Sequence, residues 1–125
     1  MTINIVIEKR GKSMSAKLSS DLLRGHTDTI VLGILSKGDN YGFEIYKTIL
    51  EKTNEEYELK ETTLYSSYKR LEKEGYITAY WGDETQGGRR KYYHITEKGK
   101  KLYTQNKKDW AFTKKILNSL LEEKR

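Results

Sequence analysis

The sequence predicts a mainly α-helical (α+β) protein, because apolar residues recur at helical spacing along most of the chain and alternate in one main stretch. The predicted order is a helix at about 20–36, a helix at about 41–53, a helix that ends at Gly75, a hairpin over 77–95 and a long helix over 96–122. Three helices followed by a hairpin form a winged helix-turn-helix. The last helix is too long to belong to that module alone.

Composition excludes several classes of protein. The chain has no cysteine, so disulfides, a thiolate nucleophile and a cysteine-based zinc site are excluded, and a reducing cytoplasm is the expected location. No run of about 18 apolar residues occurs, so we expect no membrane span. The apolar share is 35%, but ten of those residues are tyrosines, which predicts a lean core. We expect a second copy of the chain to supply the missing burial.

The chain is basic, with 24 Lys and Arg against 18 Asp and Glu and a formal net charge of +6. A basic surface is the usual electrostatic signature of a nucleic-acid-binding protein. A lysine-rich surface without such a partner has the same composition, so the positions of the charges must decide.

The first two helices are predicted from caps and apolar spacing. Ser20 or Asp21 can cap the first helix, in which apolar residues recur over 22–35. Asn40 follows a polar turn and can cap the second helix, whose isoleucines are spaced by four. Apolar and polar residues alternate over 57–59, which predicts a very short strand.

The third helix has the clearest pattern. Leu64, Tyr68 and Leu71 recur at i, i+4 and i+7, and Gly75 can supply the left-handed residue that ends the helix. The face opposite this stripe carries hydroxyls and cations, namely Thr62, Ser66, Lys69 and Lys73.

That polar face has the chemistry of a helix that reads DNA. A helix in the major groove needs short donors and acceptors near its N-terminal end, and we expect base contacts from Thr62, Thr63, Ser66 and Ser67. The longer side chains expected to contact phosphates are Tyr65, Lys69 and Arg70. An ordinary solvated helix face is the alternative, since these residue types are common there.

The predicted hairpin adds a second basic segment. After a turn-rich tip, Gly88 precedes three consecutive cations, Arg89, Arg90 and Lys91. Glycine lets a backbone approach DNA closely, and the cations can displace counterions or enter a minor groove. Acidic residues at 83 and 84 weigh against this reading, and a charged loop that keeps an edge strand soluble is the alternative.

No catalytic or metal-binding motif is evident. The chain has two histidines, His26 and His94, which we expect on a helix surface and on a hairpin strand. A Gly-rich phosphate loop is absent, because Gly87 and Gly88 lie within the hairpin. We therefore predict no enzyme, no cofactor and no metal; loss of a turnover on replacing either histidine would revive the enzyme alternative.

The last helix carries a seven-residue repeat. Thr96 can cap it, and Tyr103, Trp110 and Leu117 recur every seven residues, with Asn106, Thr113 and Leu120 offset by three. Such a repeat on a helix that has left its domain predicts packing against a two-fold mate. Trp110 is then part of the dimer core, or an indole wall of a ligand cavity, with Thr113 and Lys114 as polar neighbours.

These patterns divide the chain into three parts. Residues 1–17 are predicted to be a flexible N-terminal extension, because 1–13 lack a helical period and Met14 resembles a second start. Residues 18–95 form the predicted winged helix-turn-helix DNA-binding domain, and 96–125 the C-terminal dimerisation helix.

Several segments closely resemble the PadR family of bacterial transcriptional regulators: 21–25 (DLLRG), 41–45 (YGFEI), 63–65 (TLY), 70–75 (RLEKEG) and 88–96 (GRRKYYHIT). The resemblance runs from about Leu18 to the C-terminus and is similar to the small subfamily with one C-terminal helix. The segment 80–88 and Trp110 resemble the multidrug-sensing branch of that subfamily.

The resemblance implies a homodimeric repressor with the third helix in the major groove and the wing against the backbone or minor groove. It implies that Trp110 and its mate stack a planar aromatic ligand. Lys114 replaces an aspartate of that branch, so a preference for cationic drugs does not follow, and Phe112 also departs from it. We therefore predict a DNA-binding regulator that binds a pseudo-palindromic operator and is released by a hydrophobic effector. A winged-helix module for protein contacts or RNA is the alternative.

Overall fold

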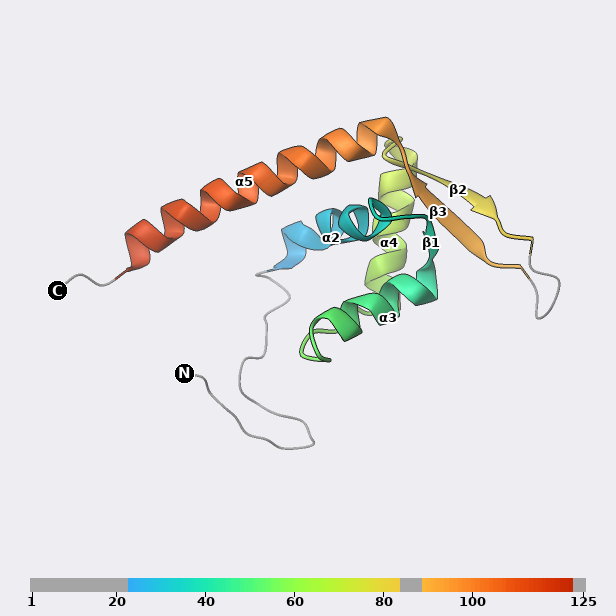
Figure 1. Ribbon diagram of the computed structural model, residues 1–125, viewed down its shortest axis with the longest axis horizontal. Helices are drawn as coiled ribbons and strands as arrows, with labels where there is room; N and C mark the ends of the chain where they lie inside the picture. The colour runs from blue at the N-terminus through green and yellow to red at the C-terminus, as the bar shows by residue number, and fades with distance from the viewer. Residues whose placement is uncertain (1–22, 84–88, 123–125) are drawn as a thin grey trace.

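The computed structural model describes residues 23–83 and 89–122 as a helical body, a small sheet and a long projecting helix (Figure 1). The helices are the 3-10 helix η1 (Arg24–His26), α2 (Thr27–Leu35), α3 (Gly42–Lys52), α4 (Glu61–Lys73) and α5 (Glu97–Leu121). The strands are β1 (Asn40–Tyr41), β2 (Ile77–Trp81) and β3 (Lys91–Ile95). This order confirms the predicted mainly α (α+β) fold. The predicted extension over 1–17, the caps at Ser20 and Asp21, and Gly88 lie outside the described residues.

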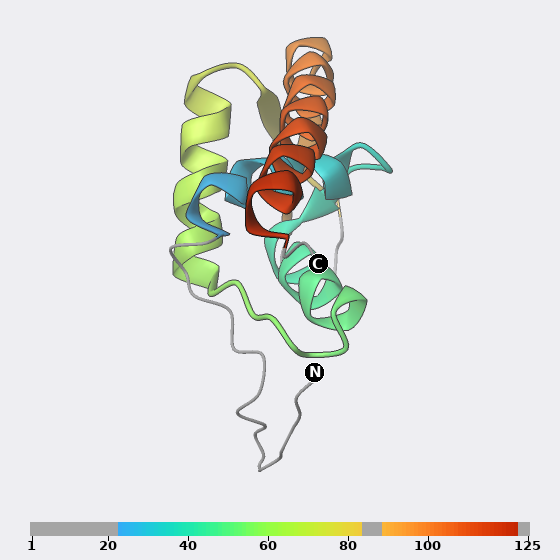
Figure 2. The same ribbon diagram turned by 90° about the vertical axis from the view of Figure 1, so that its left-hand side faces the viewer.

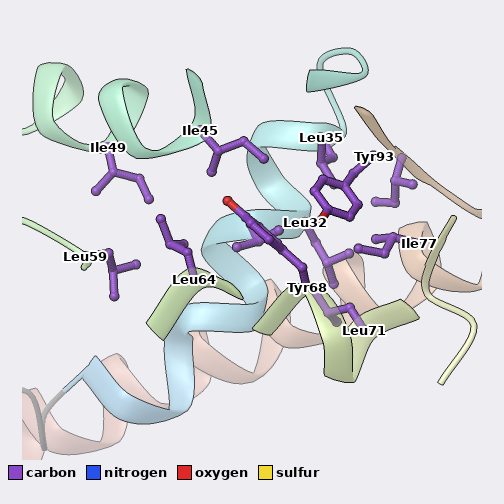
Figure 3. Packing of buried hydrophobic residues seen from close by; sticks show 12 residues of the cluster. Leu32, Leu35, Ile45, Ile49, Leu59, Leu64, Tyr68, Leu71, Ile77 and Tyr93 are labelled. Atoms are coloured by element: carbon purple, nitrogen blue, oxygen red, sulfur yellow. The ribbon is translucent and has the colours of Figure 1, made fainter. Parts of the chain in front are cut away.

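The core lies where α2, α3 and α4 meet one face of the sheet (Figure 3). Its buried residues are Val31, Leu32, Leu35, Ile45, Ile49, Leu59, Leu64, Tyr68, Leu71, Ile77, Tyr93 and Ile95. The two tyrosine rings pack with their centroids 4.6 Å apart, which joins α4 to β3. The apolar period of each helix therefore decides which face turns inward.

The sheet is antiparallel, with strand order β1-β3-β2. Ile77 pairs with Ile95 and Tyr80 with Tyr92, so side chains alternate between the core and the outer face. On the outer face the rings of Tyr41 and Tyr80 lie 5.4 and 5.6 Å from that of Tyr92. The hairpin of β2 and β3 forms the wing, and β1 fastens it to the start of α3.

The start of α5 is fixed by a cap and a glycine. The side-chain oxygen of Thr96 accepts a hydrogen bond of 3.0 Å from the backbone N–H of Gly99, which confirms the predicted cap. Gly99 is buried, and a Cβ there would overlap the carbonyl group of Tyr76. Only glycine therefore lets the first turn of α5 approach the segment that joins α4 to β2.

From there α5 runs over α2, which it crosses in Figure 2, and leaves the body, as Figure 1 shows. A Cβ on Gly33 would lie 3.0 Å from the Tyr103 ring, so the two helices approach closely at this glycine. One turn further, the Asn106 side chain donates a 2.8 Å hydrogen bond to the hydroxyl of Thr29. The described helices, α5 included, lack a stretch that is both long and apolar enough to cross a membrane.

Three predicted details are wrong. The predicted first helix is not one α-helix in its described part, because the 3-10 helix η1 directly precedes α2. Asn40 does not cap α3: it lies in β1 opposite Tyr93, and Tyr41 occupies the N-cap position instead. The backbone of residue 40 is used for pairing with β3, which the polar turn alone did not indicate.

The predicted strand at 57–59 is also wrong, since these residues form no strand. Leu59 is buried in the core, and the backbone N–H of Tyr57 donates to the Thr53 hydroxyl at 3.2 Å. The alternation there reflects a loop that points one side chain into the core. Gly75, by contrast, ends α4 with φ +84°, as predicted.

Candidate nucleic-acid interface

The two faces of α4 have different surroundings. Leu64, Tyr68 and Leu71 are buried against the core, whereas Thr62, Thr63, Tyr65, Ser66, Lys69 and Arg70 are exposed. No side chain caps the first turn of α4, so its leading backbone N–H groups lack a capping partner. The exposed face thus presents hydroxyls near the N-terminal end and cations further along.

Ser67 departs from the predicted set of base-reading hydroxyls. Its side chain is completely buried, and its hydroxyl donates a 2.6 Å hydrogen bond to Asp28 on α2. The prediction that Ser67 contacts a base is therefore wrong. Its spacing was the missed signal, because it lies three residues after Leu64 and four before Leu71, within the apolar stripe.

Arg70 is exposed on α4, but its guanidinium already has a partner within the protein. Its Nε and Nη2 donate to the two carboxylate oxygens of Asp28 at 3.1 and 2.6 Å. These bonds and the negative charge of Asp28 raise the pKa of Arg70, although partial burial opposes the rise. A phosphate contact by Arg70 stays a prediction.

An open groove of about 980 Å³ lies between the start of α3, the first half of α4 and β3. Its aromatic walls are Phe43, which is 54% exposed, and Tyr65, which is 55% exposed. Lys47 lies 5.7 Å from the Phe43 ring, and Lys69 lies 5.6 Å from the Tyr65 ring. Both walls therefore carry a cation held over an aromatic ring.

The wing contributes the remaining cations. Arg90 and Lys91 line the groove, and the Arg90 guanidinium lies 4.7 Å from the Tyr41 ring. Arg89 is exposed further along the wing, with its guanidinium 5.9 Å from the ring of Trp81. The groove thereby joins the exposed face of α4 to the basic start of β3.

Sequence reasoning missed three residues of this surface: Tyr41, Phe43 and Lys47. Each belongs to the turn into α3 or to its first half, and the groove joins them to Thr62 and Ser66 on α4. The signal present in the sequence is two aromatic residues around Gly42 at a helix start. Their place beside the wing depends on β1, which was not predicted.

A polar cluster fixes the base of the wing to the turn before α3. The Tyr80 hydroxyl donates to Asp39 at 2.6 Å, and Nδ1 of His94 lies 2.8 Å from the other carboxylate oxygen of Asp39. Partial burial alone would raise the pKa of Asp39, but the bonds to Tyr80 and His94 and the His94 charge outweigh it and lower that pKa. The bond to Asp39, with some burial and the Asp39 charge, raises the pKa of Tyr80 to about 12.

The predicted residues on α5 lie in its exposed second half. Trp110 is 43% exposed and contacts His26 edge-on, with the ring centroids 5.0 Å apart. Thr113, Lys114 and Leu117 are exposed on the same helix.

Neither histidine belongs to a cluster of potential metal ligands in the part of the chain that the structure describes. His26 packs on Trp110 and His94 on Asp39, and no group of three or more potential metal ligands occurs within 23–83 and 89–122.

A helix with an exposed face of hydroxyls and cations, set beside a basic hairpin, defines the class of winged helix-turn-helix proteins that bind DNA. Within this class, the chain belongs to the PadR-like family of transcriptional regulators, whose family model matches residues 31–105. Regulators of this family bind DNA and are not enzymes. The predicted family membership is confirmed.

Similar proteins come from several bacteria. A transcriptional regulator from Clostridium thermocellum has a similar structure, with 52% identity and a TM-score of 0.78 over 84% of this chain and 99% of that chain. A PadR family regulator from Clostridium difficile is 41% identical, with a TM-score of 0.68 over 78% of this chain and 99% of that one. An uncharacterised protein from Lysinibacillus sphaericus is 45% identical over 103 residues, which are 82% of this chain and 94% of that protein.

Proposed function

We propose that this protein is a homodimeric transcriptional repressor that binds a pseudo-palindromic operator through α4 and the wing. The observation that carries the proposal is the groove that joins the exposed hydroxyls of α4 to the cations of β3, with aromatic walls and one acidic lining residue, Glu61. Thr62, Thr63 and Ser66 read base edges, because their short side chains let the backbone of α4 approach the major groove. Tyr65 and Lys69 contact phosphates and set the register of the helix.

The wing binds the same duplex beside α4. Arg89, Arg90 and Lys91 contact the phosphate backbone or enter the minor groove, and Gly88 lets the tip approach closely. Their cation–aromatic contacts with Trp81, Tyr41 and Tyr93 hold three long side chains in place before DNA arrives. Less side-chain freedom is then lost on binding.

The second copy sets the spacing of the two reading helices. The exposed apolar residues of α5, which include Trp110, Ile116 and Leu117, pack against the same residues of the mate. The two α4 helices then occupy half-sites about one helical turn apart, roughly 34 Å.

Salt dependence of DNA binding tests the phosphate contacts. Replacing Lys69 or Arg89 by Ala should weaken binding to every duplex and reduce the slope of log affinity against log salt by about one unit for each lost contact. Lys101→Ala on α5 removes the same charge away from the groove and should leave the slope unchanged. Unchanged slopes in both interface variants would contradict these assignments.

We further propose that a planar aromatic effector binds at Trp110 and releases the operator. Trp110 is exposed in one copy and belongs to the sequence repeat with Thr113 and Leu117, and Lys114 is a polar neighbour. Two copies would therefore bring two indoles to the two-fold axis. The effector must bind one dimer geometry more tightly than the other. Trp110→Ala should abolish quenching of tryptophan fluorescence by planar aromatic dyes and leave operator affinity measurable. Persistent quenching would assign it to Trp81 or another site.

A further inference from the structure

One carboxylate joins α2 to α4. Asp28 accepts three hydrogen bonds, from the Ser67 hydroxyl at 2.6 Å and from Nη2 and Nε of Arg70 at 2.6 and 3.1 Å. The Asp28 side chain is 29% exposed and that of Arg70 is 54% exposed. These contacts join residues about forty positions apart, so they belong to the tertiary arrangement of the two helices.

This cluster is stronger than an ordinary surface ion pair. An exposed pair of single contacts contributes little, because salt and side-chain entropy oppose it. Here the guanidinium binds in the two-pronged geometry that fixes direction, and the third donor is a buried hydroxyl. Moving α4 relative to α2 would leave the Ser67 hydroxyl without its acceptor inside the protein.

Other residues of α2, and one residue of the preceding η1, contact α5. Thr29 accepts the hydrogen bond from Asn106, Gly33 lies against the Tyr103 ring, and His26 in η1 contacts Trp110. The helix α2 therefore stands between α4 and α5 (Figure 2). Hydrogen bonds of its side chains join it to both. A change in the angle between α4 and α5 must break contacts on at least one side of α2.

We propose that Asp28 is a positioning residue, which fixes α4 to α2 and thereby sets the spacing of the two reading helices of the dimer. The proposal rests on the proposed function, since it concerns how the operator is recognised. Asp28 contributes to discrimination between duplexes, and as a carboxylate it cannot itself add to the general affinity for phosphates. For Arg70 the proposal replaces the predicted phosphate contact, because its guanidinium is already bound to Asp28 and acts through it.

The test compares the Asp28→Asn variant with the wild type on two duplexes at fixed salt, the native upstream duplex and a scrambled one. The amide keeps the volume and an acceptor for Ser67 but removes the charge that holds Arg70. We expect affinity for the native duplex to fall about tenfold, the effect of one lost charge-assisted hydrogen bond. Affinity for the scrambled duplex should stay the same or rise, because Arg70 is released.

The matched control is Glu72→Gln, which makes the same change in net charge on the exposed surface of α4. It should change both affinities equally. Arg70→Gln gives the second comparison: a positioning role predicts lower affinity for the native duplex with an unchanged salt slope, whereas a phosphate contact predicts lower affinity for both duplexes and a slope smaller by about one unit.

The outcomes separate the inference from the proposed function. Equal losses on both duplexes for Asp28→Asn, or no loss on either, would overturn the positioning role. The double variant Asp28→Asn with Arg70→Gln should lose no more discrimination than either single variant, and additive losses would also overturn it. Equal binding of both duplexes by the wild type would instead refute the proposed function, and the inference with it.

Discussion

One seven-residue repeat, Tyr103, Trp110 and Leu117, runs along α5, but the two halves of the helix have opposite surroundings. In the first half Gly99 is buried, and Leu102, Tyr103 and Asn106 are partly covered by the body. In the second half every described residue from 107 onward is exposed, including the large apolar residues Trp110, Phe112, Ile116, Leu117, Leu120 and Leu121. The helix continues without a break between the two halves.

The difference shows how far along α5 the body of one copy buries the side chains of the helix. The close cover of α5 by α2 reaches about Asn106, and beyond it the His26 ring in η1 still contacts Trp110, which stays 43% exposed. An exposed group of large apolar side chains marks an interaction surface. The lean apolar composition fits this division, since part of the apolar surface is left for a partner. The first half of α5 belongs to the body and the second half to the predicted dimer.

The largest expected effect comes from a charge in the second half. Leu117→Glu places one carboxylate from each copy in the predicted interface, and we expect the dimer to weaken about 1000-fold, or roughly 4 kcal/mol. The stability of the body should not change. Sedimentation equilibrium measures the dissociation constant, and Lys115→Glu, on the opposite side of α5, is the control. An intact Leu117→Glu dimer would place the interface elsewhere.

The second largest effect is expected in the first half of α5. Gly99→Ala places a Cβ against the Tyr76 carbonyl, and because that backbone cannot move without loss of the Thr96 contacts, we expect the free energy of unfolding to fall by about 2–3 kcal/mol. Urea unfolding at a fixed protein concentration measures it. Gly25→Ala, where a Cβ meets nothing within 4 Å, is the matched control. Equal stabilities for the two variants would contradict the close approach of α5 to the body.

The smallest expected effect concerns the hydrogen bond between Tyr80 and Asp39 at the base of the wing. The pKa of Tyr80 is raised to about 12 by its hydrogen bond to Asp39, above an unfolded value near 10. A folded pKa above the unfolded one means that this contribution to stability is complete below pH ~10 and is lost as the pH rises through 12. The difference in tyrosinate absorbance between wild type and Tyr80→Phe should have its midpoint near pH 12. Asp39→Asn should move this midpoint toward pH ~10, and a midpoint near 10 in the wild type would refute the contact.

The elements set by local pattern could be predicted from the sequence. The buried stripe of α4, the glycine that ends it and the Thr96 cap depend on residues within one or two turns of each other. The strand β1 could not be predicted, because two residues form it only by pairing with β3 some fifty positions later.

The candidate site shows the same limit. The exposed hydroxyls and cations of α4 could be predicted from helical spacing. The burial of Ser67 could have been predicted in the same way, because its position in the helix, and not its residue type, places it on the buried face. Two features depend on how the helices pack against each other: the contact of Asp28 with Arg70 and the position of Phe43 beside the wing. The residue pattern within a single helix does not predict such packing.

We propose that α4 and the wing together recognise a specific duplex. Fluorescence anisotropy can compare a labelled duplex from the upstream region of the gene with a scrambled duplex at the same salt concentration. We expect the native duplex to bind more tightly by about 4 kcal/mol or more. Equal affinity for the two duplexes would contradict specific recognition and leave only a basic surface that binds DNA through its charge.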